Sequence, residues 1–284
     1  MSETRFFEQK DGSEIAYRIF ESETINNEIP LVLIMGLGGT KEIFMGYEEE
    51  LAKNQKVIVF DNRGIGESTV VSQSDPITIE LMAQDTTEFI KHLGIKKFNL
   101  FGGSMGGHIA LHIALNIPPD LKLEKLVVGC GFARHPNIEQ ADKFFQLPEM
   151  NFPKTVQEQK DWLLKSEKSY ADYLLEHPDK FDKIAEYLVS TNDIRPFEIC
   201  KRQWEAVKKS DLTSRLHMIK VPTLIIHGEA DELVPIKEAE LLDREIPNTQ
   251  LYRIPKVGHS IYVTAPETTI IVNEFLNKDI AVQA

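Results

Sequence analysis

The chain has 284 residues, of which 42% are hydrophobic, so it can bury a large core as one domain or as one domain with an insertion. Its formal net charge of −12 disfavours nucleic acid as a partner, because phosphates require a basic surface. The two cysteines, Cys130 and Cys200, predict neither a disulfide framework nor a metal site, and such usage is typical of a reducing compartment.

The N-terminal residues lack the apolar run of a signal peptide, and no later stretch approaches the length of a membrane span. We therefore expect a cytoplasmic protein with no membrane-spanning segment. The sequence leaves the oligomeric state open.

Strands and helices alternate over the first 130 residues. A hairpin is predicted over residues 3–8 and 13–20, around Asp11-Gly12. Unbroken apolar runs at 30–35 and 57–60 predict strands that are covered on both faces, and further strands are predicted at 98–101 and 126–128. Helices are predicted between these strands, from about 40 to 53, at 77–93 and at 105–117.

The alternation stops at residue 131, and aromatic residues then lie among charged ones, namely Phe144, Phe145, Trp162, Tyr170, Tyr173, Phe181, Tyr187 and Trp204. We interpret 131–218 as a helical cap inserted into a core formed by 1–130 and 219–284. The alternation resumes with predicted strands at 221–226 and 251–254 and predicted helices after Pro235 and at 266–277. This order indicates an α/β fold with a mostly parallel sheet, helices on both faces and a site at the carboxyl ends of the strands.

The segment Gly102-Gly103-Ser104-Met105-Gly106 lies between a predicted strand and a predicted helix and has the pattern G-x-S-x-G. In this context the pattern predicts a nucleophile elbow, in which a strained turn exposes the serine hydroxyl above the sheet. A side chain at 102 or 106 would collide across so sharp a turn. Backbone N–H groups at the start of the helix favour negative charge near Ser104. Ser104 is therefore the predicted nucleophile.

A serine nucleophile needs a base, and the base needs an acid that orients it. In hydrolases with such an elbow, the acid and then the histidine follow the serine in chain order. The strand at 221–226 is followed by His227-Gly228-Glu229-Ala230-Asp231-Glu232, and the last strand by Val257-Gly258-His259-Ser260. The residue types alone leave Glu229, Asp231 and Glu232 open as the acid.

The chain resembles the α/β-hydrolase superfamily over essentially its whole length. The matching segments, in order, are Met35-Gly36-Leu37-Gly38-Gly39, Asp61-Asn62-Arg63-Gly64-Ile65-Gly66-Glu67-Ser68, the elbow, His227-Gly228-Glu229-Ala230-Asp231 and Gly258-His259. The resemblance implies that Ser104 is the nucleophile, Asp231 the acid and His259 the base. It further implies an oxyanion hole formed by the backbone N–H groups of Leu37 and Met105. Met35 departs from the common form, in which a histidine often precedes the glycine, but the backbone supplies the donor there.

The activity expected from this resemblance is cofactor-independent and metal-free hydrolysis of a carboxylic ester or lactone through an acyl-enzyme. Three alternatives remain open: acyl transfer, because the elbow also resembles that of homoserine acetyltransferases; a prolyl-iminopeptidase-like hydrolase; and a hydrolase-derived receptor that binds a ligand. A serine at position 104 excludes the carboxylate nucleophile of dehalogenases and epoxide hydrolases. The expected partner is a small-molecule acyl substrate, whose identity the sequence does not indicate.

Other charged residues favour structural interpretations. His108 and His112 form H-x-x-x-H, but the glutamate of a zinc peptidase is absent, so packing or hydrogen bonding is favoured. A structural role is likewise favoured for His227. By resemblance, Asp61 and Arg63 brace their loop with hydrogen bonds.

Overall fold

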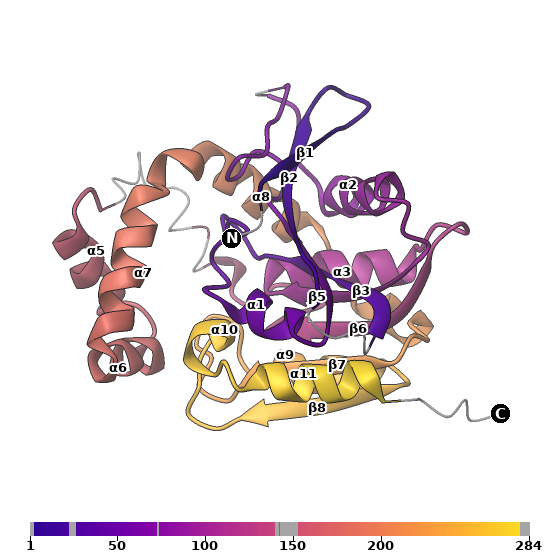
Figure 1. The fold of residues 1–284 in the computed structure, drawn as a ribbon. Helices are drawn as coiled ribbons and strands as arrows, with labels where there is room; N and C mark the ends of the chain where they lie inside the picture. Colours follow the sequence, from indigo (N-terminus) through magenta and orange to yellow (C-terminus); the bar gives the residue numbers. More distant parts are fainter. Residues whose placement is uncertain (1–2, 23–26, 73, 140–141, 143–152, 279–284) are drawn as a thin grey trace.

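The computed structural model describes residues 3–22, 27–72, 74–139, 142 and 153–278, and an eight-stranded sheet forms the centre of this described chain (Figure 1). In spatial order the strands are β1 (Arg5–Glu8), β2 (Glu14–Phe20), β4 (Gln55–Phe60), β3 (Asn27–Ile34), β5 (Lys97–Gly103), β6 (Lys122–Gly129), β7 (Thr223–Gly228) and β8 (Thr249–Ile254). β1 and β2 pair antiparallel, β2 pairs antiparallel with β4, and β3 to β8 run parallel. The predicted α/β fold with a mostly parallel sheet is confirmed.

β1 and β2 form the predicted hairpin, in which Phe7 pairs with Ile15. The Ser13 N–H donates to Asp11 Oδ1 at 2.9 Å, and Gly12 has a φ of 84°. An L-residue with a side chain rarely adopts that φ, whereas glycine does so at little cost. The short Asp11-Gly12 segment is thus enough to reverse the chain.

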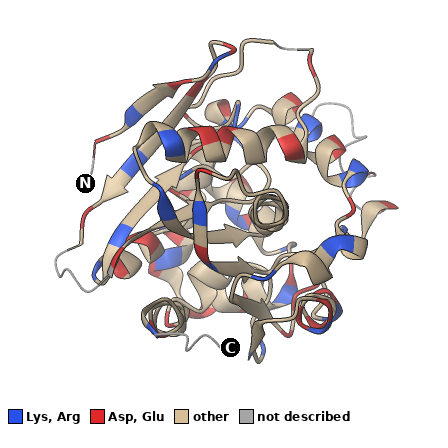
Figure 2. Cartoon of the chain, turned by 90° about the vertical axis from the view of Figure 1, so that its right-hand side faces the viewer, with Lys and Arg blue, Asp and Glu red and all other residues tan. Residues whose placement is uncertain are grey.

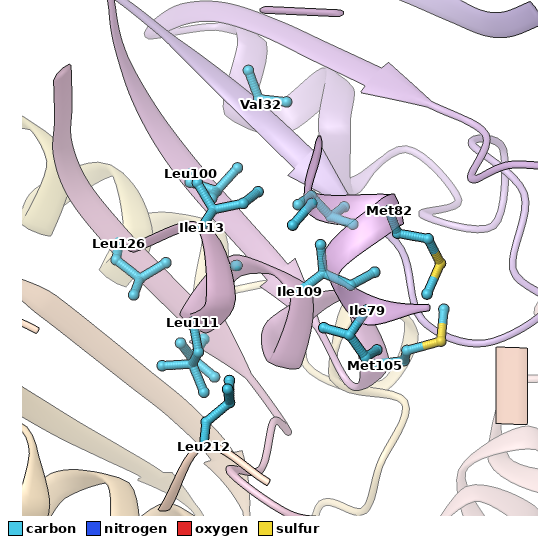
Figure 3. Close-up of a cluster of buried hydrophobic side chains, with 14 of the residues drawn as sticks. Val32, Ile79, Met82, Leu100, Met105, Ile109, Leu111, Ile113, Leu126 and Leu212 are labelled. Carbon is cyan, nitrogen blue, oxygen red and sulfur yellow. The ribbon is translucent and has the colours of Figure 1, made fainter. Parts of the chain in front are cut away.

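Helices cover both faces of the parallel strands, which explains the unbroken apolar runs. Val32 and Ile34 belong to a buried cluster with α2 (Ile79–His92) and α3 (Met105–Leu115), part of which is drawn in Figure 3. Leu31 and Leu33 belong to a second cluster with α1 (Tyr47–Ala52) and α11 (Thr268–Asn277). Because successive strand residues point to opposite faces, each strand needs apolar residues at every position.

The connection from β6 to β7 covers residues 131–218, which the sequence analysis interprets as an insertion, and its described part is helical. Its described elements are α5 (Val156–Leu163), α6 (Lys168–Glu176), α7 (Pro178–Ser190), η1 (Asn192–Ile194), α8 (Phe197–Lys209) and η2 (Thr213–Met218). Phe144 and Phe145, counted among its aromatic residues, lie outside the described residues. In Figure 1, α5, α6 and α7 stand to one side of the sheet, whereas α8 lies against the core.

The insertion has two parts that differ in how they are buried. We call α5, α6 and α7, residues 156–190, the lobe. Leu163, Phe181 and Ile184 of the lobe form a small cluster that includes Val263 of the short helix α10 (Ile261–Thr264). In contrast, Trp204 of α8 and residues of η2 belong to the large cluster that packs against the sheet. The lobe therefore has its own small core, while α8 shares the main one.

Outside the insertion, the predicted helix ends lie within two residues of the observed ones with one exception, and one helix was not predicted. The helix expected from about residue 40 begins only at Tyr47. Gly46 has a φ of 94°, which an α-helix does not contain, and Lys41 forms a buried ion pair with Asp61. The four-residue helix α10, directly after the His259 segment, was not predicted. The helix after Pro235 is α9 (Lys237–Glu245).

Acidic and basic residues are interspersed along the helices and strands seen in Figure 2, instead of gathering into one basic band in this view. None of the helices in the described ranges has both the length and the apolar composition that crossing a membrane requires.

Candidate active site

The predicted elbow joins β5 to α3, and Ser104 is its corner. Ser104 has a φ of 55° and a ψ of −121°, a conformation that L-residues rarely adopt. Its N–H donates to Gly129 O on β6 at 2.8 Å, and its carbonyl accepts the Gly107 N–H at 2.9 Å. These bonds hold the serine at the carboxyl end of the sheet in spite of the strained backbone.

Glycines on both sides of Ser104 are required by close backbone contacts. A Cβ on Gly102 would lie 2.2 Å from Gly106 O, and one on Gly106 would lie 2.1 Å from Ile34 O. Real Cβ atoms do not approach backbone atoms so closely, so any larger residue would force the strand and helix apart. The steric reason inferred from the sequence pattern agrees with this geometry.

His259 and Asp231 meet at the neighbouring strand ends. His259 Nδ1 lies 2.8 Å from Asp231 Oδ2. The other carboxylate oxygen, Oδ1, accepts the N–H groups of Leu233 at 3.0 Å and Val234 at 2.7 Å. Both oxygens therefore have donors, which fixes the carboxylate in one orientation.

Electrostatics stabilise the charged forms of this pair. Burial of Asp231 opposes ionisation, but the His259 charge and several donated hydrogen bonds hold the pKa of Asp231 well below its ordinary value. Burial of His259 favours the neutral ring, but the Asp231 charge and hydrogen bond raise the pKa of His259 above its ordinary value. The arrangement suits an imidazole that has to accept a proton.

Glu229 and Glu232, the other two candidate acids, do not bond His259. Glu229 accepts from Arg253 Nε at 2.9 Å, and both side chains are exposed. Glu232 is exposed at a cavity beside Asp231. Of the three acids left open by the residue types, the structure places Asp231 against the histidine.

Ser104 and His259 line one cavity of about 570 Å³. Most of its lining side chains are apolar, including Met35, Leu37, Ile43, Met105, Phe132, Trp162, Trp204, Val207, Leu233 and Tyr262. The polar lining residues are His135, Asn137, Glu232 and Ser260 beside Ser104 and His259. Among the described lining residues there is no lysine or arginine, so the cavity offers an apolar surface around one polar end.

The loop after β3 approaches the elbow closely. A Cβ on Gly36 would lie 3.0 Å from Ser104 Cβ, and the Gly38 N–H donates to Gln203 Oε1 of α8 at 2.9 Å. Within the described chain, neither the Leu37 N–H nor the Met105 N–H donates to a protein acceptor. Met105 begins α3, where N–H groups have no acceptor within the helix. Leu37 and Met105 both line the cavity that contains Ser104.

The loop after β4 is braced as the resemblance implied. The Asp61 carboxylate accepts the Lys41 N–H at 2.6 Å, Lys41 Nζ at 2.8 Å and the Glu67 N–H at 2.9 Å. Arg63 makes two bonds to Asp85, at 2.8 and 2.6 Å. Lys41 with Asp61 and Arg63 with Asp85 form two buried ion pairs, and none of these four side chains lines the cavity.

His108 and His227 are fully buried and have structural contacts. His108 Nδ1 lies 3.0 Å from Phe132 O and Nε2 lies 2.8 Å from Ser210 Oγ, while burial lowers its pKa to about 4. His227, at the end of β7, donates from Nε2 to Val234 O at 2.7 Å, and this nitrogen lies 3.3 Å from Asp231 Oδ2. A packing role for these two histidines agrees with the sequence-based interpretation.

Two residues at the site carried no functional prediction. His135, just beyond β6, lines the cavity, and its ring packs edge-on against Trp204 at 4.8 Å. Glu167, before α6 in the lobe, accepts the backbone N–H of His259 at 2.8 Å. Neither residue lies in a recognisable motif, so the sequence contains no signal that singles it out.

The described residues contain one close group of three potential metal ligands, Cys130, Asp231 and His259, whose ligand atoms lie within 4.8 Å of one another. Burial raises the pKa of the Cys130 thiol well above its ordinary value, and the other two side chains already bond each other. A protonated thiol and an occupied His–Asp pair are a poor donor set for a cation.

A serine elbow at the end of a parallel sheet, facing a His–Asp pair on two following loops, is the arrangement typical of one fold family. The chain belongs to that family, because residues 29–266 match the family model described as the alpha/beta hydrolase fold.

Individual relatives agree with this assignment. The chain is similar to the putative carbamate hydrolase RutD of Caulobacter sp. (strain K31), with 28% identity over 240 residues, 84% of this chain and 86% of that protein. It is similar in structure to a hydrolase from Pseudomonas aeruginosa PA01, with a TM-score of 0.81, 24% identity and coverage of 97% and 98%. A thermophilic esterase from Thermogutta terrifontis gives a TM-score of 0.77 at 26% identity, again covering 97% and 98%. Family and relatives support hydrolase activity.

Proposed function

We propose that this protein is a serine hydrolase that cleaves carboxylic ester or lactone bonds through an acyl-enzyme, with Ser104 as nucleophile, His259 as base and Asp231 as orienting acid. The observation that carries the proposal is the strained, cavity-facing Ser104 in the same cavity as His259, whose Nδ1 lies 2.8 Å from Asp231 Oδ2.

The reaction follows from this arrangement. Ser104 Oγ attacks the substrate carbonyl while its proton passes to His259, and Asp231 stabilises the imidazolium that forms. The negative charge that develops on the carbonyl oxygen accepts hydrogen bonds from the backbone N–H groups of Leu37 and Met105. The imidazolium then protonates the leaving alcohol. Water, deprotonated by His259, attacks the acyl-enzyme and releases the acid.

The cavity favours an uncharged substrate with an apolar acyl group. Its walls are mainly aliphatic and aromatic, and Glu232 is the one carboxylic acid among its described lining residues, which disfavours an anionic substrate. We further propose that residues 131–218 act as a cap that selects the substrate, because both Trp162 and Trp204 of this insertion line the cavity.

The first experiment is labelling with a fluorophosphonate probe. Wild-type protein is expected to be labelled, and Ser104→Ala is expected not to be, because the probe phosphonylates the activated serine. Labelling that persists in Ser104→Ala would contradict the assignment. Turnover of p-nitrophenyl butyrate then separates an enzyme from a receptor that keeps the triad only for binding.

The substrate class is tested with a panel of an ester, a lactone, a thioester and a carbamate, the last included because relatives such as RutD are named as putative carbamate hydrolases. Addition of a competing alcohol separates hydrolysis from acyl transfer, and a proline aryl amide tests the peptidase alternative. We expect the ester or lactone with the longest tolerated apolar acyl group to have the highest kcat/KM.

A further inference from the structure

Glu167 joins the lobe to both loops that carry the His–Asp pair. It lies directly before α6, and its side chain is half-buried. Glu167 Oε1 accepts the backbone N–H of Glu232 at 2.7 Å, and Oε2 accepts the backbone N–H of His259 at 2.8 Å. One carboxylate thus holds the residue next to Asp231 and His259 itself, from positions 65 and 92 residues away in the chain.

The His259 loop is shaped to admit this carboxylate. A Cβ on Gly258 would lie 1.9 Å from Glu167 Oε2 and 2.3 Å from Ser169 Oγ. Any side chain at position 258 would therefore displace Glu167 from the His259 N–H. Gly258 therefore leaves the space that the Glu167 carboxylate occupies. This steric fit is independent of the two hydrogen bonds.

The lobe is well placed to carry such a residue. Its small hydrophobic cluster includes Val263 of α10, four residues after His259. Apolar packing therefore fixes the lobe to the segment that follows His259, while Glu167 bonds His259 and the acid loop. The lobe thus meets this region through both apolar packing and a charged side chain.

The carboxylate also adds negative charge beside the histidine. Burial raises the pKa of Glu167, while the two donated N–H bonds oppose this rise by stabilising the carboxylate. The other titratable groups around the His259 ring are Asp231, His135 and the Cys130 thiol. Of these, Asp231 bonds the ring directly and Glu167 supplies a second negative charge that favours the imidazolium.

We propose that Glu167 is a positioning residue for the reaction, which holds the His259 and Asp231 loops in register and stabilises the imidazolium formed when Ser104 is deprotonated. The inference rests on the proposed function. It assigns the lobe a part in the chemistry besides substrate selection, because removing the Glu167 carboxylate disturbs the base without altering any group that touches the substrate.

The test compares Glu167→Gln with Glu176→Gln. Both variants remove one negative charge, from the residue before α6 or from its last residue, but Glu176 is exposed and is not among the described residues that line the cavity. Glutamine at 167 keeps the size of the side chain and one carbonyl acceptor. Its NH₂ group cannot accept a hydrogen bond, so one of the two backbone N–H groups, of Glu232 or of His259, loses its acceptor. Thermal melting and near-UV circular dichroism establish that both variants are folded.

Two quantities are measured. The first is the pKa of the His259 ring, followed by NMR and assigned by its disappearance in His259→Gln. The second is the plateau rate of fluorophosphonate labelling at high pH, where His259 is neutral. For Glu167→Gln we expect the pKa to fall by about one unit, because a nearby negative charge is lost. We expect the plateau rate to fall about 10-fold or more, because the base is less well placed.

An unchanged His259 pKa in Glu167→Gln, or a plateau rate equal to that of Glu176→Gln, would overturn the proposal. A purely structural role would lower the melting temperature without moving the pKa. Failure of the proposed function has a different signature, namely a wild-type protein that is not labelled at Ser104. The NMR titration needs no reactive serine, so the two failures are distinguishable.

Discussion

The two parts of the helical insertion are joined to the sheet in different ways. Helix α8 and η2 contribute Trp204, Val207 and Leu216 to the main hydrophobic core, and Gln203 of α8 bonds the loop after β3. The lobe, in contrast, has a small cluster of its own, which includes Val263 of α10, and it contacts the His259 segment through Glu167. One continuous insertion can therefore contain a part that packs into the main core and a part that has a small core of its own.

The comparison predicts where each kind of mutation will act. Substitutions in the loops at the ends of the strands should lower the reaction rate, and substitutions in α8 should lower stability. Substitutions in the lobe, apart from Glu167, should mainly alter substrate selectivity. Two tryptophans that line the same cavity, one on α8 and one on the lobe, make the contrast testable.

The largest effect is expected for Asp231→Asn. Without the carboxylate, His259 loses the partner that fixes its tautomer, so turnover of p-nitrophenyl butyrate should fall by about 10³–10⁴-fold. Glu229→Gln, which changes an exposed acid paired with Arg253, is the matched control and should leave turnover within a few-fold. A comparable loss in Glu229→Gln would mean that the acid has been assigned wrongly.

The next largest effect is expected for the tryptophan on α8. Trp204 is 2% exposed, and its Nε1 donates to Asp142 Oδ1 at 2.7 Å. Trp204→Ala should lower the free energy of unfolding by about 3–5 kcal/mol, because it leaves a large cavity in the core. Chemical denaturation measures this directly. A loss of stability below about 1 kcal/mol would mean that α8 contributes no more to the main core than the lobe does, which would contradict the comparison.

A smaller effect is expected for the tryptophan on the lobe. Trp162 is 44% exposed although it lines the cavity, so Trp162→Ala should change stability little. It should instead shift the ratio of kcat/KM between short and long acyl esters by about 10–200-fold, the range for a contact in an apolar pocket. Fluorophosphonate labelling of Ser104 should stay at the wild-type rate. An unchanged ratio would mean that the lobe does not select the substrate.

The smallest predicted change is a shift in pH dependence. The base must be neutral to accept the Ser104 proton, so activity should rise with pH through the pKa of His259. That pKa is raised by Asp231 and Glu167, which places the rise above the ordinary histidine value of about 6.5. In Asp231→Asn the residual activity should rise at lower pH. A profile that is flat from pH 5 to 8 while chemistry limits the rate would contradict a histidine base.

Much of the fold could be predicted because its signals are local. The hairpin needs only Asp11-Gly12, and the elbow needs only small residues at 102 and 106 around Ser104. The start of α1 was predicted several residues too early, because the ion pair of Lys41 with Asp61 joins positions 20 residues apart. Sequence periodicity does not report such a contact.

The sequence by itself determined the order of strands and helices, the strained serine and the two loops that bring Asp231 and His259 to the sheet edge, because each depends on neighbouring residues and on the geometry of parallel strands. The family resemblance already pointed to Asp231, but only the tertiary structure showed its contact with His259, the position of His135 in the cavity wall and the bonds of Glu167 to both loops. It also divided the insertion between core and lobe. These features are contacts between distant segments, whose partners are chosen by packing and charge in three dimensions.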